Sequence, residues 1–234
     1  MKAIITAAGT GSRLGEVTKS IPKCLLKIGK KMIIERQIEA LEANGINDIS
    51  MVIGYHADKI KKALKNKNIK FYLNKDYDKT GMLESLFCAR KEFDDDIIII
   101  YGDVVFEDDL LKKLLKDNND FCLVVDRKEG IKKSSPRISI ANGIIKEISR
   151  DLPQEENVEY IGMSKFSQKA IKIFDDRVKD LIDSGEIKKY PSPSYLFNWL
   201  VHNGHSIHVV FADGSLYQEI DYIDDLENAK KKFN

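Results

Sequence analysis

The chain has little of what marks a secreted, membrane-bound or nucleic-acid-binding protein. It contains only three cysteines in 234 residues, and its 38 basic side chains are balanced by 37 acidic ones. A net charge of +1 creates no general field that would attract nucleic acid. Cys24, Cys88 and Cys122 are far apart and lack the Cys-x-x-Cys spacing of a metal or redox site. Isolated cysteines of this kind are typical of buried thiols in a reducing compartment.

Long apolar runs are missing too. No stretch reaches the length of about 18 apolar residues that a membrane-spanning helix needs. The apolar start of the chain, residues 1–8, is broken by glycine before it reaches the length of a signal sequence. We therefore expect a cytoplasmic protein whose partners include neither a membrane nor nucleic acid.

Two common catalytic patterns are also absent from the sequence. The four histidines give no pair with the spacing of two metal ligands on one helix face beside a carboxylate. No Gly-x-Ser-x-Gly turn of a serine hydrolase occurs. The chemistry must therefore rest on other residue types.

The strongest positive signal lies in the first 23 residues. The apolar run Ala3–Ala7 leads into a turn that holds Gly9 and Gly11, and Arg13 and Lys23 follow. A buried strand that ends in a glycine-rich turn presents backbone N–H groups to a phosphate, and the two cations add fixed positive charge. The glycines alone would also suit a plain tight turn. Together with the two cations they favour a nucleotide site.

The spacing is not that of the two best-known phosphate loops. A P-loop would close with Gly-Lys-Ser or Gly-Lys-Thr, and a dinucleotide fingerprint would have its third glycine where Leu14 stands. The loop therefore predicts a phosphate site of another type.

Strands and helices alternate along the first half of the chain. Apolar runs predict strands over 49–53, 69–73 and 97–101, with amphipathic helices between them. Four consecutive isoleucines, 97–100, predict a central parallel strand that is buried on both faces. We therefore expect an α/β fold with a doubly wound, mostly parallel sheet between two layers of helices, a three-layer α/β/α arrangement.

The second half adds antiparallel structure. Asn142-Gly143 lies between two alternating runs, a pattern that predicts a hairpin with a two-residue turn. A helix is expected from an N-cap at Ser167 to about Ser184, and the last clear strand is expected over 206–212. No repeat or linker divides the chain, which predicts a single domain over 1–234. The polar stretch 129–136 is expected to form a loop near an acceptor.

The N-terminal motif resembles a known family signature. The run A-A-G-T-G-S-R-L at 7–14, followed by Pro22-Lys23, is similar to the signature of the nucleotidyltransferases that make NDP-sugars and CDP-alcohols. The resemblance implies a Rossmann-like, GT-A-like fold and a glycine-rich loop that wraps a triphosphate. It also implies that Arg13 binds phosphate and that Lys23 contacts the α-phosphate or the incoming phosphate, so that these two are the catalytic residues.

The resemblance also implies a magnesium site. Asp103 follows the isoleucine strand, at the sheet edge where open α/β sheets bind ligands. Asp221 ends the segment Glu219-Ile220-Asp221, which resembles a late element of the family. These two aspartates are expected to hold Mg²⁺, because a nucleoside triphosphate needs a metal to neutralise its charge. Capping of a turn is the alternative role for Asp103.

Further site residues follow from the same resemblance. Gly81 and Ser85 are expected near the nucleobase, although Ser85 would also suit the polar face of a helix. Glu159 and Tyr160 are expected near the acceptor. The full set of expected nucleotide-binding residues is Ala7, Ala8, Gly9, Thr10, Gly11, Ser12, Gly81, Ser85 and Gly102.

Three segments resemble one branch of the family in particular. Residues 29–38, 74–77 and 81–86 look most like the small cytidylyltransferases that act on phosphocholine, 2-aminoethylphosphonate or phosphoglutamine. This implies CTP as donor, a small phosphorylated or phosphonylated acceptor, Mg²⁺ as cofactor and release of pyrophosphate. It also implies a product for the decoration of a surface polysaccharide. The oligomeric state stays open, a homodimer included.

Other functions compete with this interpretation. A sugar-1-phosphate nucleotidyltransferase would share the motif, but proline commonly follows the leucine that is Leu14 here, and Gly15 stands in that place. A nucleotide-sensing module would be expected to lose Lys23 or a metal aspartate. A glycosyltransferase would be expected to show Asp-x-Asp, whereas Asp103 is followed by two valines.

A choline-type acceptor would require an aromatic cage around its quaternary ammonium group. Aromatic side chains that are available for it, or for core packing, are Tyr160, Tyr190, Tyr195 and Trp199.

Overall fold

The computed structural model describes residues 1–128, 131, 135–153, 155–156 and 158–233. Of the loop expected over 129–136, only residues 131, 135 and 136 belong to this described part. None of the described helices is long and apolar enough to cross a membrane.

One mixed sheet of nine strands forms the centre of the molecule, in the order β5-β4-β1-β6-β11-β8-β12-β10-β9. Its strands are β1 (Lys2–Ala7), β4 (Ile49–Ile53), β5 (Ile69–Leu73), β6 (Ile97–Tyr101), β8 (Phe121–Arg127), β9 (Arg137–Ala141), β10 (Ile144–Ser149), β11 (Val158–Phe166) and β12 (His208–Phe211). Two small antiparallel pairs accompany it: β2 (Lys27–Ile28) with β3 (Lys31–Met32), and β7 (Val104–Phe106) with β13 (Tyr217–Glu219).

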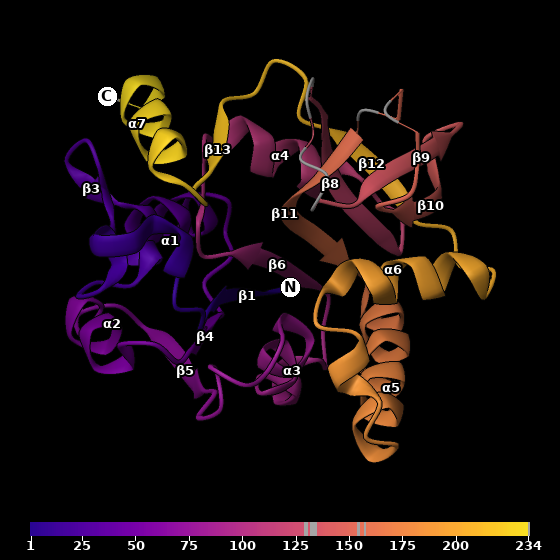
Figure 1. Ribbon diagram of the computed structural model, residues 1–234, viewed down its shortest axis with the longest axis horizontal. Helices are drawn as coiled ribbons and strands as arrows, with labels where there is room; N and C mark the ends of the chain where they lie inside the picture. Colours follow the sequence, from indigo (N-terminus) through magenta and orange to yellow (C-terminus); the bar gives the residue numbers. More distant parts are fainter. Residues whose placement is uncertain (129–130, 132–134, 154, 157, 234) are drawn as a thin grey trace.

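Helices cover both faces of the sheet (Figure 1). They are α1 (Ile33–Ala43), α2 (Ala57–Ala63), α3 (Met82–Phe87), α4 (Asp108–Lys116), α5 (Gln168–Asp183), α6 (Pro193–His202) and α7 (Ile223–Lys232). Apolar side chains of α1, α2 and α4 pack on one face, and those of α3, α5 and α6 pack on the other. The expected α/β/α architecture is therefore confirmed.

The isoleucine strand β6 is buried on both faces, as expected. Ile98 and Ile100 belong to the core under α1 and α4, whereas Ile97 and Ile99 belong to the core under α3 and α5. Its neighbours differ from the prediction, because β6 pairs in parallel with β1 but antiparallel with β11. The sheet changes from parallel to mixed pairing at this strand.

The expected hairpin joins β9 and β10. Asn142 and Gly143 have φ angles of 54° and 73°, the left-handed conformation that a two-residue turn of this type requires at both positions. Ser167 caps α5, and its Oγ accepts a hydrogen bond from the backbone N–H of Ala170 at 3.1 Å. Both local signals are confirmed.

The last helix packs against the first part of the chain. Figure 1 shows α7 next to β3 and α1, and the Arg36 side chain of α1 donates a hydrogen bond to the Phe233 carbonyl at 2.9 Å. Leu226 and Phe233 pack with Leu14, which follows the glycine-rich turn. The last helix thus brings the segment that precedes it next to the loop that follows β1.

Candidate active site

The candidate site begins where β1 and β6 end, at the same edge of the sheet. The Gly102 N–H donates a hydrogen bond to the Thr6 carbonyl at 2.8 Å. A side chain at Gly102 would place its Cβ 2.9 Å from that carbonyl oxygen and 2.9 Å from the Ala7 Cβ. Glycine is therefore needed here, because it lets the segment that carries Asp103 lie against the loop after β1.

The glycines of the loop have different roles. Gly11 has a φ of +65°, and a Cβ on it would lie 2.8 Å from Cγ of Lys23. Gly11 therefore leaves room for the Lys23 side chain to pass. A Cβ on Gly9 would meet no atom within 4 Å. The space in front of Gly9 is open to a ligand.

Gly11→Ala is expected to lower turnover because it would displace Lys23. Gly45→Ala is the matched control, since Gly45 also has a positive φ (+79°) but its Cβ would meet nothing within 4 Å. Both variants place an alanine at a positive φ, which costs about 1–2 kcal/mol. Only Gly11→Ala should lower kcat, by up to about a hundredfold if Lys23 moves by about 1 Å. Equal kcat values for the two variants, measured beside their thermal unfolding, would show that Gly11 does not act through Lys23.

Lys23 joins the two aspartates. Its ammonium Nζ lies 3.0 Å from Oδ2 of Asp103 and 2.7 Å from Oδ1 of Asp221. Arg13 contacts the other oxygen of Asp221 at 2.7 Å. Burial alone would lower the pKa of Lys23, but the two carboxylates raise it above its ordinary value, so Lys23 is charged at neutral pH.

The pairing of β13 with β7 brings the two aspartates together. Ile220 donates its N–H to the Asp103 carbonyl at 2.9 Å, directly after the β7–β13 ladder ends. Asp225 then accepts hydrogen bonds from the backbone N–H groups of Asp221 and Tyr222 at the start of α7. Asp225 therefore acts at the start of this helix.

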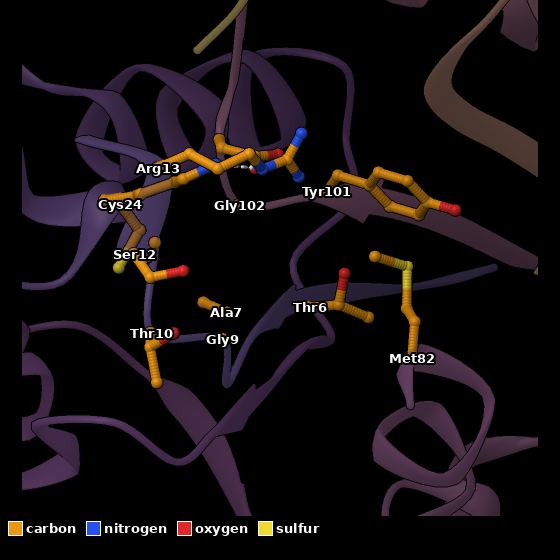
Figure 2. Close-up of a pocket in the computed structure, with 13 residues that line it drawn as sticks. Thr6, Ala7, Gly9, Thr10, Ser12, Arg13, Cys24, Met82, Tyr101 and Gly102 are labelled. Carbon is orange, nitrogen blue, oxygen red and sulfur yellow. Dashed lines mark hydrogen bonds and ion pairs between the residues drawn. The ribbon is translucent and has the colours of Figure 1, made fainter. Parts of the chain in front are cut away.

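A cavity of about 290 Å³ lies beside this cluster (Figure 2). Figure 2 shows Thr10, Ser12 and Cys24 on one side and Thr6, Tyr101 and Met82 on the other, with Arg13 reaching across between them. The cavity is lined by Thr6, Ala7, Gly9, Thr10, Gly11, Ser12, Arg13, Lys23, Cys24, Met82, Tyr101, Gly102 and Asp103. It thus has a cationic end and an end formed by Met82 and Tyr101.

Three of the residues expected to bind nucleotide do not line this cavity. Gly81 packs against Pro191, whose Cα would lie 2.6 Å from a Cβ at Gly81. Ser85 is buried and accepts a hydrogen bond from the Asn74 side chain at 2.9 Å. Ala8 is buried in the core below the loop. The neighbours of these residues within the protein account for their small size and polarity.

Sequence reasoning missed Thr6, Cys24, Met82 and Tyr101 in the same cavity. The Thr6 hydroxyl is buried and has no hydrogen-bond partner among the described residues. A polar residue inside an otherwise apolar strand is the signal that would have found it. Burial and the nearby Asp103 raise the pKa of the Cys24 thiol to about 12, so it is protonated at neutral pH and is no nucleophile.

A second cavity, of about 580 Å³, adjoins the first. Arg13 and Tyr101 line both cavities, and Asp221 lines the second. The second cavity is lined by Arg13, Tyr101, Lys128, Ile131, Ser135, Pro136, Ile138, Ile148, Arg150, Glu159, Tyr160, Ser192, Ser194, Phe197, Gln218, Glu219, Asp221 and Asp225. The Lys23–Asp221 ion pair therefore marks the place where the two cavities meet.

Glu159 and Tyr160, which the sequence analysis expected near an acceptor, both line the second cavity. Tyr160 packs edge-to-face on Tyr101, with ring centroids 5.5 Å apart, and on Phe197 at 5.6 Å. The other aromatic residues considered for a cage lie elsewhere: Tyr190 packs on Tyr195, and Trp199 lies under the Arg177 guanidinium.

Glu219 is an acidic residue of the second cavity to which the sequence analysis gave no role. Burial and the nearby carboxylates of Asp103 and Asp221 raise its pKa to about 8. A further negative charge is therefore unfavourable there in the absence of a cation. A cation bound beside Glu219 would lower this pKa again.

Two residues that follow β4 hold the turn before Lys23 in place. The Tyr55 hydroxyl donates to the carbonyls of Thr18 and Lys19 at 3.0 and 2.9 Å, and a ring nitrogen of His56 lies 3.1 Å from the Lys19 carbonyl. These residues follow β4, and they position the segment between the glycine-rich loop and Lys23.

Known proteins resemble this chain over most of its length. The model of the MobA-like NTP transferase domain matches residues 3–232. The CTP:phosphoglutamine cytidylyltransferase of Campylobacter jejuni is 35% identical over 97% of this chain and 98% of its own length. The choline-phosphate cytidylyltransferase of Streptococcus pneumoniae is 34% identical over 46% of this chain and 47% of its own length.

A solved structure shows the same fold. The structure of a CTP:phosphocholine cytidylyltransferase from Streptococcus pneumoniae superposes with a TM-score of 0.82 at 22% identity, covering 98% of this chain and 97% of the other. The match to the family model spans almost the whole chain, including the loop, both aspartates and the last helix. The chain therefore belongs to the MobA-like NTP transferase family.

Proposed function

We propose that this chain is a cytidylyltransferase that joins CTP to a small phosphorylated or phosphonylated acceptor and releases pyrophosphate. The observation that carries the proposal is the cluster of Lys23, Arg13 and two aspartates between two adjoining cavities. One cavity has the glycine-rich loop that suits a triphosphate, and the other has room for a second substrate. The relatives named above are cytidylyltransferases, which supports CTP as the donor.

The donor set of the site fits Mg²⁺. Oxygens of Asp103 and Asp221 converge on one cation, the Lys23 ammonium, within 3.0 Å. Magnesium is commonly held by one or two carboxylates together with phosphate oxygens of a substrate. Among the described residues no group of three metal-ligating side chains gathers at one point, so Asp103 and Asp221 would rely on the triphosphate for further ligands. When bound, the ion would neutralise part of the triphosphate charge.

The two cavities suit an in-line transfer. An anionic oxygen of the acceptor would attack the α-phosphorus of CTP. A new oxygen–phosphorus bond forms, the bond to the bridging oxygen breaks, and pyrophosphate leaves with the electron pair. The attacking oxygen is already deprotonated, so no side chain has to remove a proton. The site must align two anions and offset their repulsion.

Two cations and the loop would perform this task. Lys23 lies where the cavities meet, and Arg13 lines both of them, so each can contact the reacting phosphates. The open space at Gly9 allows the triphosphate to approach backbone N–H groups of the loop. The cytidine would occupy the opposite end, beside Met82, Tyr101 and the unpartnered Thr6 hydroxyl.

We further propose that the protein acts in the cytoplasm as a single domain over 1–234, and that its product serves to decorate a surface polysaccharide. Three cysteines without disulfides support a reducing compartment, and the resemblance to small cytidylyltransferases supports the pathway. A nucleotide-sensing module is less well supported, because Lys23, Asp103 and Asp221 are all present and in contact.

The donor is tested by measuring pyrophosphate release with each of CTP, UTP, GTP and dTTP. Each is combined with Mg²⁺ and a panel of phosphorylated amines, amino acids and hexose 1-phosphates. We expect CTP to exceed the other nucleotides by about a hundredfold or more, because a site that hydrogen-bonds one base edge leaves buried groups unpaired with another. Faster release with UTP, GTP or dTTP and a hexose 1-phosphate would assign the chain to the sugar branch instead.

A further inference from the structure

The charged side chains that line the second cavity are mostly paired with one another. Arg13 contacts Asp221 at 2.7 Å, and Lys128 contacts Glu159 at 3.0 Å. Asp225 accepts backbone N–H groups at the start of α7. Each of these groups already has a partner within the protein.

Two charged side chains of the same cavity are left over. In the described part of the chain, neither the Glu219 carboxylate nor the Arg150 guanidinium has an ion pair or a hydrogen bond. Glu219 ends β13, where it is partly buried, and Arg150 directly follows β10, where it is exposed. The cavity therefore offers one unpaired carboxyl group, which a ligand cation would hold in its charged form, and one unpaired guanidinium, from two separate segments.

The segment that carries Arg150 is held in place from within the protein. The buried Arg137 side chain donates to the Arg150 carbonyl at 3.3 Å, the Leu152 carbonyl at 3.4 Å and the Ile131 carbonyl at 3.4 Å. A buried guanidinium that bonds three carbonyls of lining segments fixes that wall of the cavity. The backbone position of Arg150 is thus set by the fold.

Charge complementarity then selects among acceptors. A carboxylate kept from water without a cation is unfavourable, and a ligand cation relieves that cost. A sugar phosphate brings no charge beyond its phosphate. A choline phosphate brings a cation that has no N–H to donate and that prefers open aromatic faces, whereas Tyr160 packs against Tyr101 and Phe197. Neither of them would use both Glu219 and Arg150.

We infer that the acceptor is zwitterionic: a phosphorylated α-amino acid whose ammonium group binds Glu219 and whose carboxylate binds Arg150. This inference rests on the proposed function, because it takes the second cavity as the acceptor site of the CTP-dependent transfer. The phosphate of the acceptor then points to the Lys23–Asp221 pair, where the two cavities meet. The cavity of about 580 Å³ accommodates an amino acid with several side-chain atoms.

A matched series of acceptors tests the inference. O-phosphoserine and phosphoglutamine carry both charges, phosphoethanolamine lacks the carboxylate, and 3-phosphoglycerate has a hydroxyl in place of the ammonium. Phosphocholine and glucose 1-phosphate complete the series. With CTP and Mg²⁺, kcat/KM for a zwitterionic acceptor should exceed that for each of the other four by about tenfold or more, the worth of one charged hydrogen bond.

Two variants connect the preference to its residues. Arg150→Gln should reduce the ratio of kcat/KM between O-phosphoserine and phosphoethanolamine toward one, and Glu219→Gln should do the same for O-phosphoserine and 3-phosphoglycerate. If phosphoglutamine is the better zwitterion, its own decarboxylated and deaminated analogues replace the serine series. Lys146→Gln and Glu147→Gln are the controls, because both residues are exposed on β10 and do not line the cavity. These controls should leave both ratios unchanged.

The outcomes separate this inference from the proposed function. Turnover of CTP that is fastest with phosphocholine or glucose 1-phosphate would overturn the zwitterion and leave the cytidylyltransferase in place. If no acceptor supports turnover, the proposed function fails, and calorimetric binding of the same series with Mg²⁺ and a non-hydrolysable CTP analogue decides the inference. Binding of a zwitterion alone, lost in Arg150→Gln and Glu219→Gln, supports it. Absence of zwitterion binding overturns it.

Discussion

Lys23→Ala is expected to lower kcat by about a hundredfold to a thousandfold, the loss that follows removal of one preorganised charge-stabilising group. The reason is the position of the Nζ atom, 2.7 Å from Asp221 and 3.0 Å from Asp103 at the junction of the two cavities. No other described lysine lines either cavity at that junction. Transfer would therefore lose the cation closest to the reacting phosphates.

The control for this variant is Lys27→Ala, which removes the same charge from an exposed position in β2. Its kcat should match that of the unchanged protein. Lys23→Ala also leaves two carboxylates facing each other without a cation, which should lower the thermal unfolding temperature in the absence of Mg²⁺. Added Mg²⁺ should restore it. A folded Lys23→Ala protein with near-normal turnover would refute the catalytic role of Lys23.

Much of the fold follows from local patterns in the sequence. The turn at Asn142-Gly143 depends on two adjacent residues that tolerate positive φ, and the α5 cap depends on Ser167 and a backbone N–H three residues on. Such signals are complete within a few residues. The burial of the isoleucine strand is likewise visible, because only a strand covered on both faces has no polar position.

The pairing partners of strands do not follow from such local patterns. The antiparallel neighbour of β6 is β11, which lies beyond a hairpin and about sixty residues further along the chain, and no local pattern records that contact. β13 was not predicted at all, since it spans three residues with no apolar alternation. Its contact with β7 nevertheless brings Asp221 to Asp103.

The same limit applies to the site. The motif placed Gly9, Gly11, Arg13 and Lys23 around one cavity, because these residues lie close together along the loop and the turn after it. Gly81 was expected near the nucleobase, but the group that lies against it is the Pro191 backbone. A sequence can show that a position needs glycine without showing which neighbour imposes the need.

Asp103→Asn and Asp221→Asn are each expected to raise the Mg²⁺ concentration for half-maximal activity by about tenfold or more, since each removes one of two protein ligands. Asparagine keeps the shape of the side chain and its hydrogen bond to Lys23. Each change therefore tests the charge rather than the packing. Asp224→Asn is the matched control, because Asp224 is exposed in the first turn of α7 and lines neither cavity.

A second measurement does not depend on turnover. Calorimetric titration of CTP should show that Mg²⁺ tightens nucleotide binding to the unchanged protein and to Asp224→Asn, and does so less in both site variants. Asp103 and Asp221 both contact Lys23, so the effects of the two substitutions should not add. The double variant should bind Mg²⁺ about as weakly as the single variant that binds it less well. Unchanged Mg²⁺ dependence in both single variants would mean that other groups hold the ion. Glu219 would then be the next residue to change, because it lies close enough to both aspartates for their charges to raise its pKa.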